Sequence, residues 1–176
     1  MRNKAEGGSP IGLLERSAEH TEGAVFVAIA YRLGAFGWLS GPTFQKNGTP
    51  NVGLLDQRLA LEWVQNYAHL FGGDAKRVTV LGESAGAGSI LHHITAYGGA
   101  KGPGQLPFQQ AVTQSASIHN PTQSKLLEEQ VFQSFLDAAG VGTLDEARQL
   151  PSETLQLANK KIIYSAAFGL YIFRKL

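Results

Sequence analysis

One serine of the chain lies in a pattern that is typical of a covalent nucleophile. Residues 82–86 read Gly-Glu-Ser-Ala-Gly, which fits the Gly-x-Ser-x-Gly pattern of a sharp turn between a strand and a helix. In such a turn the hydroxyl of Ser84 stands above the end of a parallel strand. Gly82 and Gly86 flank it, because a Cβ at either position would collide with the neighbouring backbone. The expected chemistry is attack by the Ser84 hydroxyl on a carbonyl carbon.

The turn would also stabilise the negative charge that such an attack creates. A serine at the N-terminus of a helix lies next to free backbone N–H groups and the positive end of the helix dipole. The N–H of Ala85 would donate to the oxyanion, a contribution of roughly 3 kcal/mol per donor in measured cases. The alternative is that Ser84 only caps a helix in a glycine-rich turn.

A serine hydroxyl needs a base, and the chain has five histidines. His92 and His93 lie eight and nine residues past Ser84 in the same expected helix, roughly 12 Å away at 1.5 Å per residue. We expect His20 and His69 to be solvated or to pack elsewhere. His119 follows an expected strand at residues 108–114 on the same side as Ser84, so it is the one candidate base in the chain.

Composition excludes several other kinds of function. With 15 Lys and Arg against 14 Asp and Glu, the formal net charge is +1, so no broad basic field favours nucleic acid. The chain has no cysteine, and no apolar stretch reaches signal-peptide or membrane-helix length. We expect no metal, no cofactor and no membrane span, and a small or neutral substrate. The sequence makes no prediction of oligomeric state. Residues 47–49 match an N-glycosylation sequon, which would mark a surface loop if a parent protein were secreted.

The elements that must position Ser84 follow from the apolar pattern. Residues 24–31 form an unbroken apolar run, which predicts an interior strand of a parallel sheet. Asn51 is placed to cap a helix from about Gly53, which Gly72 would end. Its expected apolar face is wide: one apolar residue recurs every four positions, and three more lie beside this row. The row consists of Leu55, Leu59, Trp63, Tyr67 and Phe71, and Ala60, Val64 and Ala68 lie beside it.

Strand and helix then alternate around the serine. Residues 77–81 predict a second strand, residues 85–97 a buried helix and residues 108–114 a third strand. This alternation indicates an α/β fold, an incomplete and mostly parallel sheet with flanking helices.

The remaining segment predicts helices without strands. One helix ends at Gly140, Thr143 and Glu146 form a capping box for a second, and Ser152 caps a third. We interpret them as a helical insertion over the sheet. The chain is then one partial domain, with a sheet core at residues 1–118 and a helical segment with a divergent tail at residues 119–176.

Four motifs together resemble the type-B carboxylesterase/lipase family. Residues 31–37, 51–61, 71–74 and 82–86 occur in that family's order, and the resemblance is densest from Gly12 to Ser117. It implies an α/β-hydrolase fold and a serine hydrolase that cleaves small carboxylic esters through an acyl-enzyme. The family includes secreted lipases, so a full-length parent could be secreted.

The resemblance also assigns roles to single residues. Ser84 matches the family's nucleophile and Ala85 one of its oxyanion donors. Glu83 would be a buried carboxylate that either supports the site electrostatically or hydrogen-bonds to backbone. Arg58 and Asp74 match charged positions, and we expect them to pair with each other.

The chain departs from the family pattern in three places. A His-Gly-Gly-Gly oxyanion segment would precede residues 12–16, and the acid and histidine partners of the serine would follow the region of resemblance. The sequence therefore predicts an esterase fragment that is inactive in isolation. The alternatives are an inactive truncated product, an esterase-like interaction module, and ester turnover with His119 as base.

Overall fold

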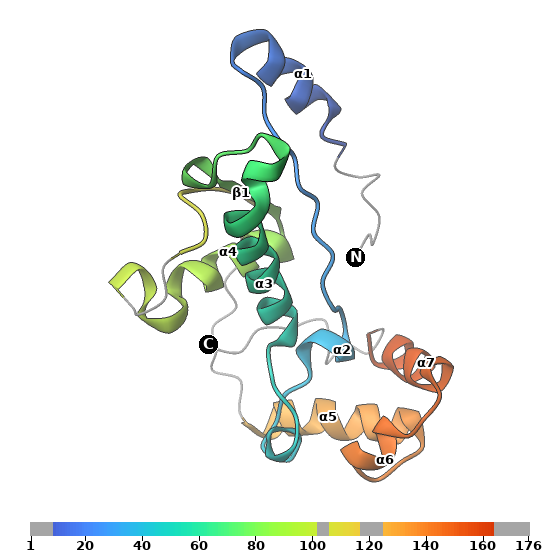
Figure 1. Ribbon diagram of the computed structural model, residues 1–176. Coiled ribbons are helices and arrows are strands. Elements are labelled where there is room, and N and C mark those ends of the chain that lie inside the picture. The colour runs from blue at the N-terminus through green and yellow to red at the C-terminus, as the bar shows by residue number, and fades with distance from the viewer. Residues whose placement is uncertain (1–8, 102–105, 117–124, 164–176) are drawn as a thin grey trace.

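The computed structural model describes residues 9–101, 106–116 and 125–163. The N-terminal part contains the helices α1 (Ile11–His20), α2 (Ala35–Trp38) and α3 (Val52–Tyr67) and the short 3-10 turn η2 (Phe44–Lys46). Two further 3-10 turns, η3 (Ala68–Phe71) and η4 (Ala75–Arg77), lead into strand β1 (Thr79–Glu83). Helix α4 (Ala85–Thr95), turn η5 (Ala96–Lys101) and strand β2 (Gln110–Gln114) follow, and helices α5 (Lys125–Ala139), α6 (Leu144–Arg148) and α7 (Ser152–Ile163) form the C-terminal part (Figure 1).

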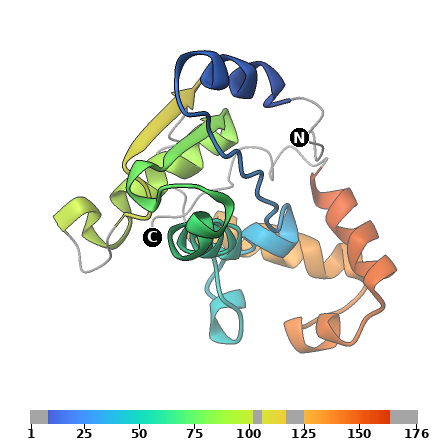
Figure 2. The ribbon, with the colours of Figure 1, turned by 45° about the horizontal axis from the view of Figure 1, so that its top comes forward.

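The two strands form a parallel sheet around the predicted turn. β1 pairs with β2 from Thr79 opposite Gln110 to Glu83 opposite Gln114. Parallel neighbours need a crossover connection, and here α4 provides it and packs against both strands (Figure 2). The predicted α/β class is confirmed, although β1 begins two residues later than expected.

The apolar run at residues 24–31 is not a strand in the described part of the chain. It has no regular secondary structure, and it runs as one uncoiled trace from α1 to α2 (Figure 1). Val25, Phe26, Val27 and Ile29 are 38–48% exposed. A strand requires a neighbouring backbone for its hydrogen bonds, and no described segment pairs with this run.

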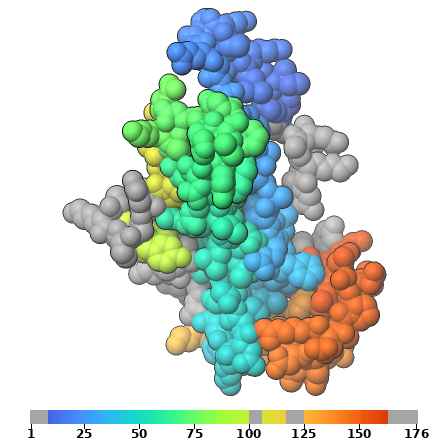
Figure 3. All heavy atoms as spheres, in the orientation of Figure 1, coloured from blue at the N-terminus to red at the C-terminus, as the bar shows by residue number. Residues whose placement is uncertain are grey.

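Helix α3 begins close to the predicted residue, but it ends at Tyr67, before the 3-10 turn η3, and it buries only part of the predicted apolar face. Its fully buried residues are Gly53, Leu54, Gln57 and Val64. Leu59 is 67% exposed, and Trp63 and Tyr67 are nearly half exposed. The helix faces the viewer in Figure 3. Trp63 packs against Tyr67 and Phe71 with ring centroids 5.5 and 6.0 Å apart. The aromatic residues of the predicted face therefore form a self-contacting surface and are not core, whereas Val64 and Ala68 beside them are buried.

Residues in the left-handed backbone region mark where α3 begins and where the 3-10 turn after it ends. Asn51 precedes it in the left-handed region (φ 58°), and its carbonyl accepts from the N–H groups of Leu54 and Leu55. Its side chain makes no capping bond, so only the position of this cap was predicted correctly. Gly72 (φ 79°) terminates η3, as expected.

Two ion pairs replace the one that was predicted. Arg58 pairs with Glu62 one helical turn away, and Asp74 pairs with Arg77, at 3.1 and 2.8 Å. The expected Arg58–Asp74 pair is therefore wrong. Residues three or four positions apart lie close together along the chain, which favours these local pairs. Arg32 forms a two-pronged pair with Asp56, which ties the end of the apolar run to α3.

The C-terminal helices share a core with α2. This core includes Ala35, Leu39, Phe132, Phe135 and Leu136, and it contains no residue of β1 or β2. The helices therefore do not lie over the sheet as expected, because their apolar faces are already covered by α2 and by one another. No helix among the described residues is long and apolar enough to cross a membrane.

Caps of these helices agree in part with the sequence. Gly140 (φ 76°) follows α5, and the Thr143 hydroxyl accepts from the N–H of Glu146. The Glu146 carboxylate accepts from Gly142 and not from Thr143, so the box is shifted by one residue. Ser152 is the first residue of α7 and not its cap; the carbonyl of Pro151 accepts there instead.

Candidate functional site

Ser84 occupies a strained turn between the parallel strand and the helix. β1 ends at Glu83, α4 begins at Ala85, and Ser84 lies between them with φ 53° and ψ −114°. The Ser84 N–H donates to the carbonyl of Gln114 at 2.9 Å, and the Ser84 carbonyl accepts from Gly88 at 3.0 Å. A non-glycine residue in this conformation costs about 1–3 kcal/mol. Both backbone bonds hold the residue in place, and its side chain is exposed.

The two glycines of the turn differ in what surrounds them. A Cβ on Gly82 would lie 2.5 Å from the carbonyl carbon of Gly86 and 2.8 Å from the nitrogen of Ala87. The expected collision is thus confirmed at Gly82. A Cβ on Gly86 would meet no described atom within 4 Å, so the same expectation is wrong there for the described residues. An added Cβ on Gly82 would enter the first turn of α4. Gly86 belongs to that turn, and its added Cβ would project into open space.

Ala85 is the first residue of α4, where backbone N–H groups have no partner inside the helix. Its methyl group packs against the cluster of Trp38 and Leu54. An N–H at this position can donate to an anion beside the Ser84 hydroxyl.

Glu83 differs from its expected environment. The sequence predicted a buried carboxylate, but Glu83 is exposed, and the structure records no hydrogen bond to its side chain from the described residues. Side chains of a strand project from the faces of the sheet, and no described element buries the Glu83 side chain on its face.

None of the four described histidines lies beside Ser84. His92 and His93 are in the last turn of α4, at the opposite end of the helix from Ser84, as predicted. His20 ends α1 and is exposed beside Glu19, and His69 is exposed in η3. His119, the candidate base, lies outside the described residues.

A chain of buried hydrogen bonds links α3 to the first turn of α4. His93 Nε2 lies 3.0 Å from the amide oxygen of Gln57, and the Gln57 amide nitrogen donates to the Ser89 hydroxyl at 3.3 Å. Ser89 donates in turn to the carbonyl of Ala85 at 2.9 Å. Sequence reasoning missed Gln57 and Ser89. The available signal was the place of Gln57, three positions after Leu54 and so on the same side of the helix.

Burial makes His93 a poor base. It lowers the pKa of His93 to about 4, and the positive charge of Arg58 contributes in the same direction. Burial also lowers the pKa of His92. A neutral His93 carries a proton on Nε2 that it donates to the Gln57 oxygen, so its role at neutral pH is structural.

We expect the chain to lose about 2 kcal/mol of unfolding free energy between pH 7 and pH 5 through His93. The folded-state pKa is below the unfolded value, so between about 6.5 and about 4 the unfolded chain binds a proton that the folded chain does not. Stability must then fall as pH falls. Urea unfolding followed by tryptophan fluorescence at both pH values measures this loss.

A matched pair of variants isolates the effect of His93. His93→Gln removes the titrating group and should flatten the pH dependence, whereas His20→Gln removes an exposed histidine and should leave the dependence as it is. Equal pH dependence in both variants would contradict the assignment to His93.

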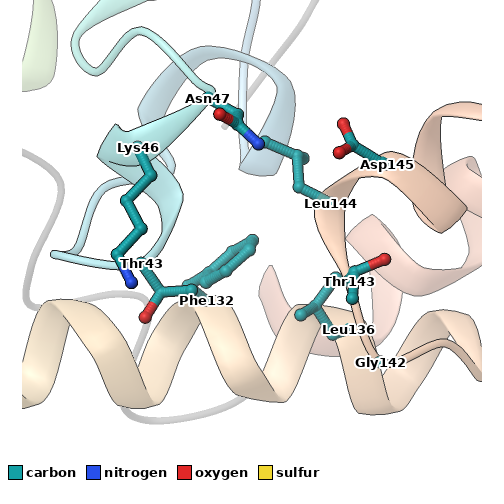
Figure 4. Close-up of a pocket in the computed structure, with 9 residues that line it drawn as sticks. All are labelled: Thr43, Lys46, Asn47, Phe132, Leu136, Gly142, Thr143, Leu144 and Asp145. Atoms are coloured by element: carbon teal, nitrogen blue, oxygen red, sulfur yellow. The ribbon is translucent and has the colours of Figure 1, made fainter.

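A cavity of about 200 Å³ lies away from the turn. It is lined by Thr43, Lys46 and Asn47 on one side, by Phe132 and Leu136 of α5, and by residues 142–145 (Figure 4). Its lining contains no serine or histidine, so it offers no pair of nucleophile and base. In the described ranges, no cluster of three or more His, Cys, Asp or Glu side chains could hold a metal ion.

Known proteins resemble this chain over nearly its whole length. A family model described as "Carboxylesterase family" matches residues 13–173. The carboxylesterase patB of Aspergillus clavatus is 50% identical over 163 residues, 92% of this chain and 29% of that protein. A secreted lipase of Arthroderma benhamiae is 44% identical over 128 residues, 73% of this chain and 24% of that protein.

Solved structures of carboxylesterases also resemble this chain. A carboxylesterase of Geobacillus stearothermophilus superposes with a TM-score of 0.71 at 29% identity, over 96% of this chain and 37% of that one. The chain thus spans about 29% of the length of the curated relative described first. The family match, the sequence identities and the superposition agree with the strand–serine–helix turn, and they show that the chain belongs to the carboxylesterase family.

Proposed function

We propose that Ser84 is the nucleophile of a carboxylic ester hydrolase. The observation that carries the proposal is the strained backbone of Ser84, held between a parallel strand and the N-terminus of a helix. A protein maintains such strain where the surrounding structure fixes it, often at reactive sites. Gly82, Glu83 and Gly86 complete the turn in this proposal, and Ala85 provides an oxyanion donor.

The proposed reaction has two halves. Ser84 Oγ attacks the ester carbonyl carbon while its proton passes to a base, and the backbone N–H of Ala85 donates to the resulting oxyanion. The alcohol leaves with a proton, and the acyl group stays on Ser84. Water then attacks the acyl carbon, which releases the carboxylic acid and restores the serine.

The proposal assigns the base and its acid partner to other parts of a longer hydrolase. No described histidine lies next to Ser84, and without both partners a serine hydrolase keeps only a small fraction of its rate. The isolated chain is then inactive, residues 1–118 are the sheet core of one domain and residues 119–176 its helical segment. Several relatives are named secreted lipases, so we propose a secreted parent protein.

A non-catalytic interaction module is the second candidate. The exposed apolar side chains of α3 and of residues 24–31 favour it. However, an interaction module has no need to keep a serine in a strained conformation, so the hydrolase explains more of the structure.

Covalent labelling tests the hydrolase. In a chimera, residues 13–173 of this chain replace the matched segment of the Aspergillus clavatus carboxylesterase. We expect a fluorophosphonate probe to add to Ser84, as located by peptide mass spectrometry. Ser84→Ala should abolish labelling, and Ser134→Ala, an exposed serine on α5, should leave it unchanged. Labelling that persists in Ser84→Ala would refute the proposed nucleophile.

A further inference from the structure

The first turn of α4 is held from inside the protein by the buried chain of hydrogen bonds described above. Among the described residues, four polar side chains are buried: Asn51, Gln57, Ser89 and His93. All of these except Asn51 take part in the hydrogen-bond network. Gln57 joins the two branches of this network, one to His93 and one to Ser89. Such concentration of buried polar groups next to the candidate nucleophile requires an explanation.

Gln57 has little freedom to adopt another arrangement. It is 5% exposed, its amide oxygen accepts from His93, and its amide nitrogen donates to Ser89. Leaving one buried polar group without its partner costs roughly 1–3 kcal/mol, so each of these bonds fixes the others.

The branch through Ser89 ends on the residue that carries the oxyanion donor. Ser89 donates to the carbonyl of Ala85, and the methyl of Ala85 packs against the cluster of Trp38 and Leu54. The carbonyl and the methyl of Ala85 are thus both fixed by groups that do not belong to the turn. The Ala85 N–H itself shares a peptide plane with the Ser84 carbonyl, which accepts from the N–H of Gly88 at 3.0 Å. Contacts that hold Ala85 in place therefore restrain the residue from which this N–H projects.

We propose that Gln57, acting through Ser89, is a positioning residue that aims the Ala85 N–H at the oxyanion formed on Ser84. The inference rests on the proposed function. Oxyanion donors contribute most when they are held at the required position before the reaction, and a displacement of about 1 Å can cost about a hundredfold in rate. Gln57 touches no reacting atom, so its effect appears in the rate of attack and not in the binding of the substrate.

The chain offers a closely matched control. Gln65 lies on the same helix, is partly buried, and donates through its amide nitrogen to the carbonyl of Pro107 at 2.9 Å. Gln57→Leu and Gln65→Leu therefore remove the same group from the same helix, but only the first breaks the connection to α4.

The first measurement follows the backbone of the full 176-residue chain. Gln57→Leu should speed amide hydrogen exchange of Gly88 and Ser89 about tenfold, relative to Gln65→Leu, because the first turn of α4 loses its anchor. Ser89→Ala, a smaller change that is less disruptive to folding, should do the same at Gly88. Equal exchange in Gln57→Leu and Gln65→Leu would overturn the inference.

The second measurement is the kinetics of fluorophosphonate labelling in the chimera. Gln57→Leu should lower the limiting rate constant about tenfold and leave the half-saturating probe concentration unchanged, and Gln65→Leu should change neither. The double variant Gln57→Leu/Ser89→Ala should be no slower than the slower single variant, because both act through Ala85. Additive losses, or a change confined to the half-saturating concentration, would overturn the positioning role. If the unsubstituted chimera is not labelled, the proposed function itself is wrong and the inference falls with it.

Discussion

Replacing Ser84 with alanine in the chimeric esterase should lower kcat for a short-chain aryl ester by roughly 10⁴- to 10⁶-fold. The hydroxyl is the atom that forms the covalent bond in the proposed reaction, so no other group on the turn can replace it. The backbone N–H of Ala85 remains, and it should preserve a small acceleration over the reaction in water. Steady-state kinetics at saturating ester measure the loss.

The Michaelis constant separates this loss from unfolding. Alanine has nearly the size of serine and adopts the same backbone conformation at the same cost, so KM should change less than threefold and the circular dichroism spectrum should not change. A decrease of less than tenfold in kcat would show that the ester is cleaved by another group.

Replacing Gly82 with alanine should destabilise the chain by about 3 kcal/mol or more. The new Cβ would lie 2.5 Å from the carbonyl carbon and 2.6 Å from the carbonyl oxygen of Gly86. Both are backbone atoms, which cannot rotate away as a side chain would, so β1 and α4 must separate. Ser84 would move with them, and labelling in the chimera should slow at least about a hundredfold.

Gly86→Ala is the matched control for this substitution. Its Cβ meets no described atom within 4 Å, and alanine favours a helix over glycine by about 1 kcal/mol. In the isolated chain it should therefore be neutral or stabilising in urea unfolding. Comparable destabilisation by both substitutions would contradict the described packing of the turn.

The turn itself was predictable from sequence because its causes are local. A β-branched run, two glycines around a serine and a small-residue helix lie within about twenty consecutive residues, and local spacing decides their geometry. The same reasoning excluded His92 and His93, since a rigid helix keeps residues eight apart at a fixed distance.

The predictions that failed required knowledge of neighbours. The spacing of apolar residues identified Leu59 and Trp63 as suited to burial, but it does not say which element covers them. In α3 the buried side is instead centred on Leu54 and Gln57. The apolar run at 24–31 failed as a strand for the same reason. Gln57 was missed because its role depends on Ser89 and His93, which lie on another helix.

The positive φ of Ser84 places two opposing demands on one residue: folding stability favours glycine there, and the reaction requires the serine hydroxyl. Glycine adopts φ 53° without steric penalty, so Ser84→Gly should make the chain more resistant to urea and should remove the covalent step of hydrolysis from the chimera. If a random library of variants were screened for heat resistance alone, variants with glycine at position 84 should be enriched. In a natural population, the survival of serine at this codon would then report on selection for turnover, because selection for folding pulls the other way.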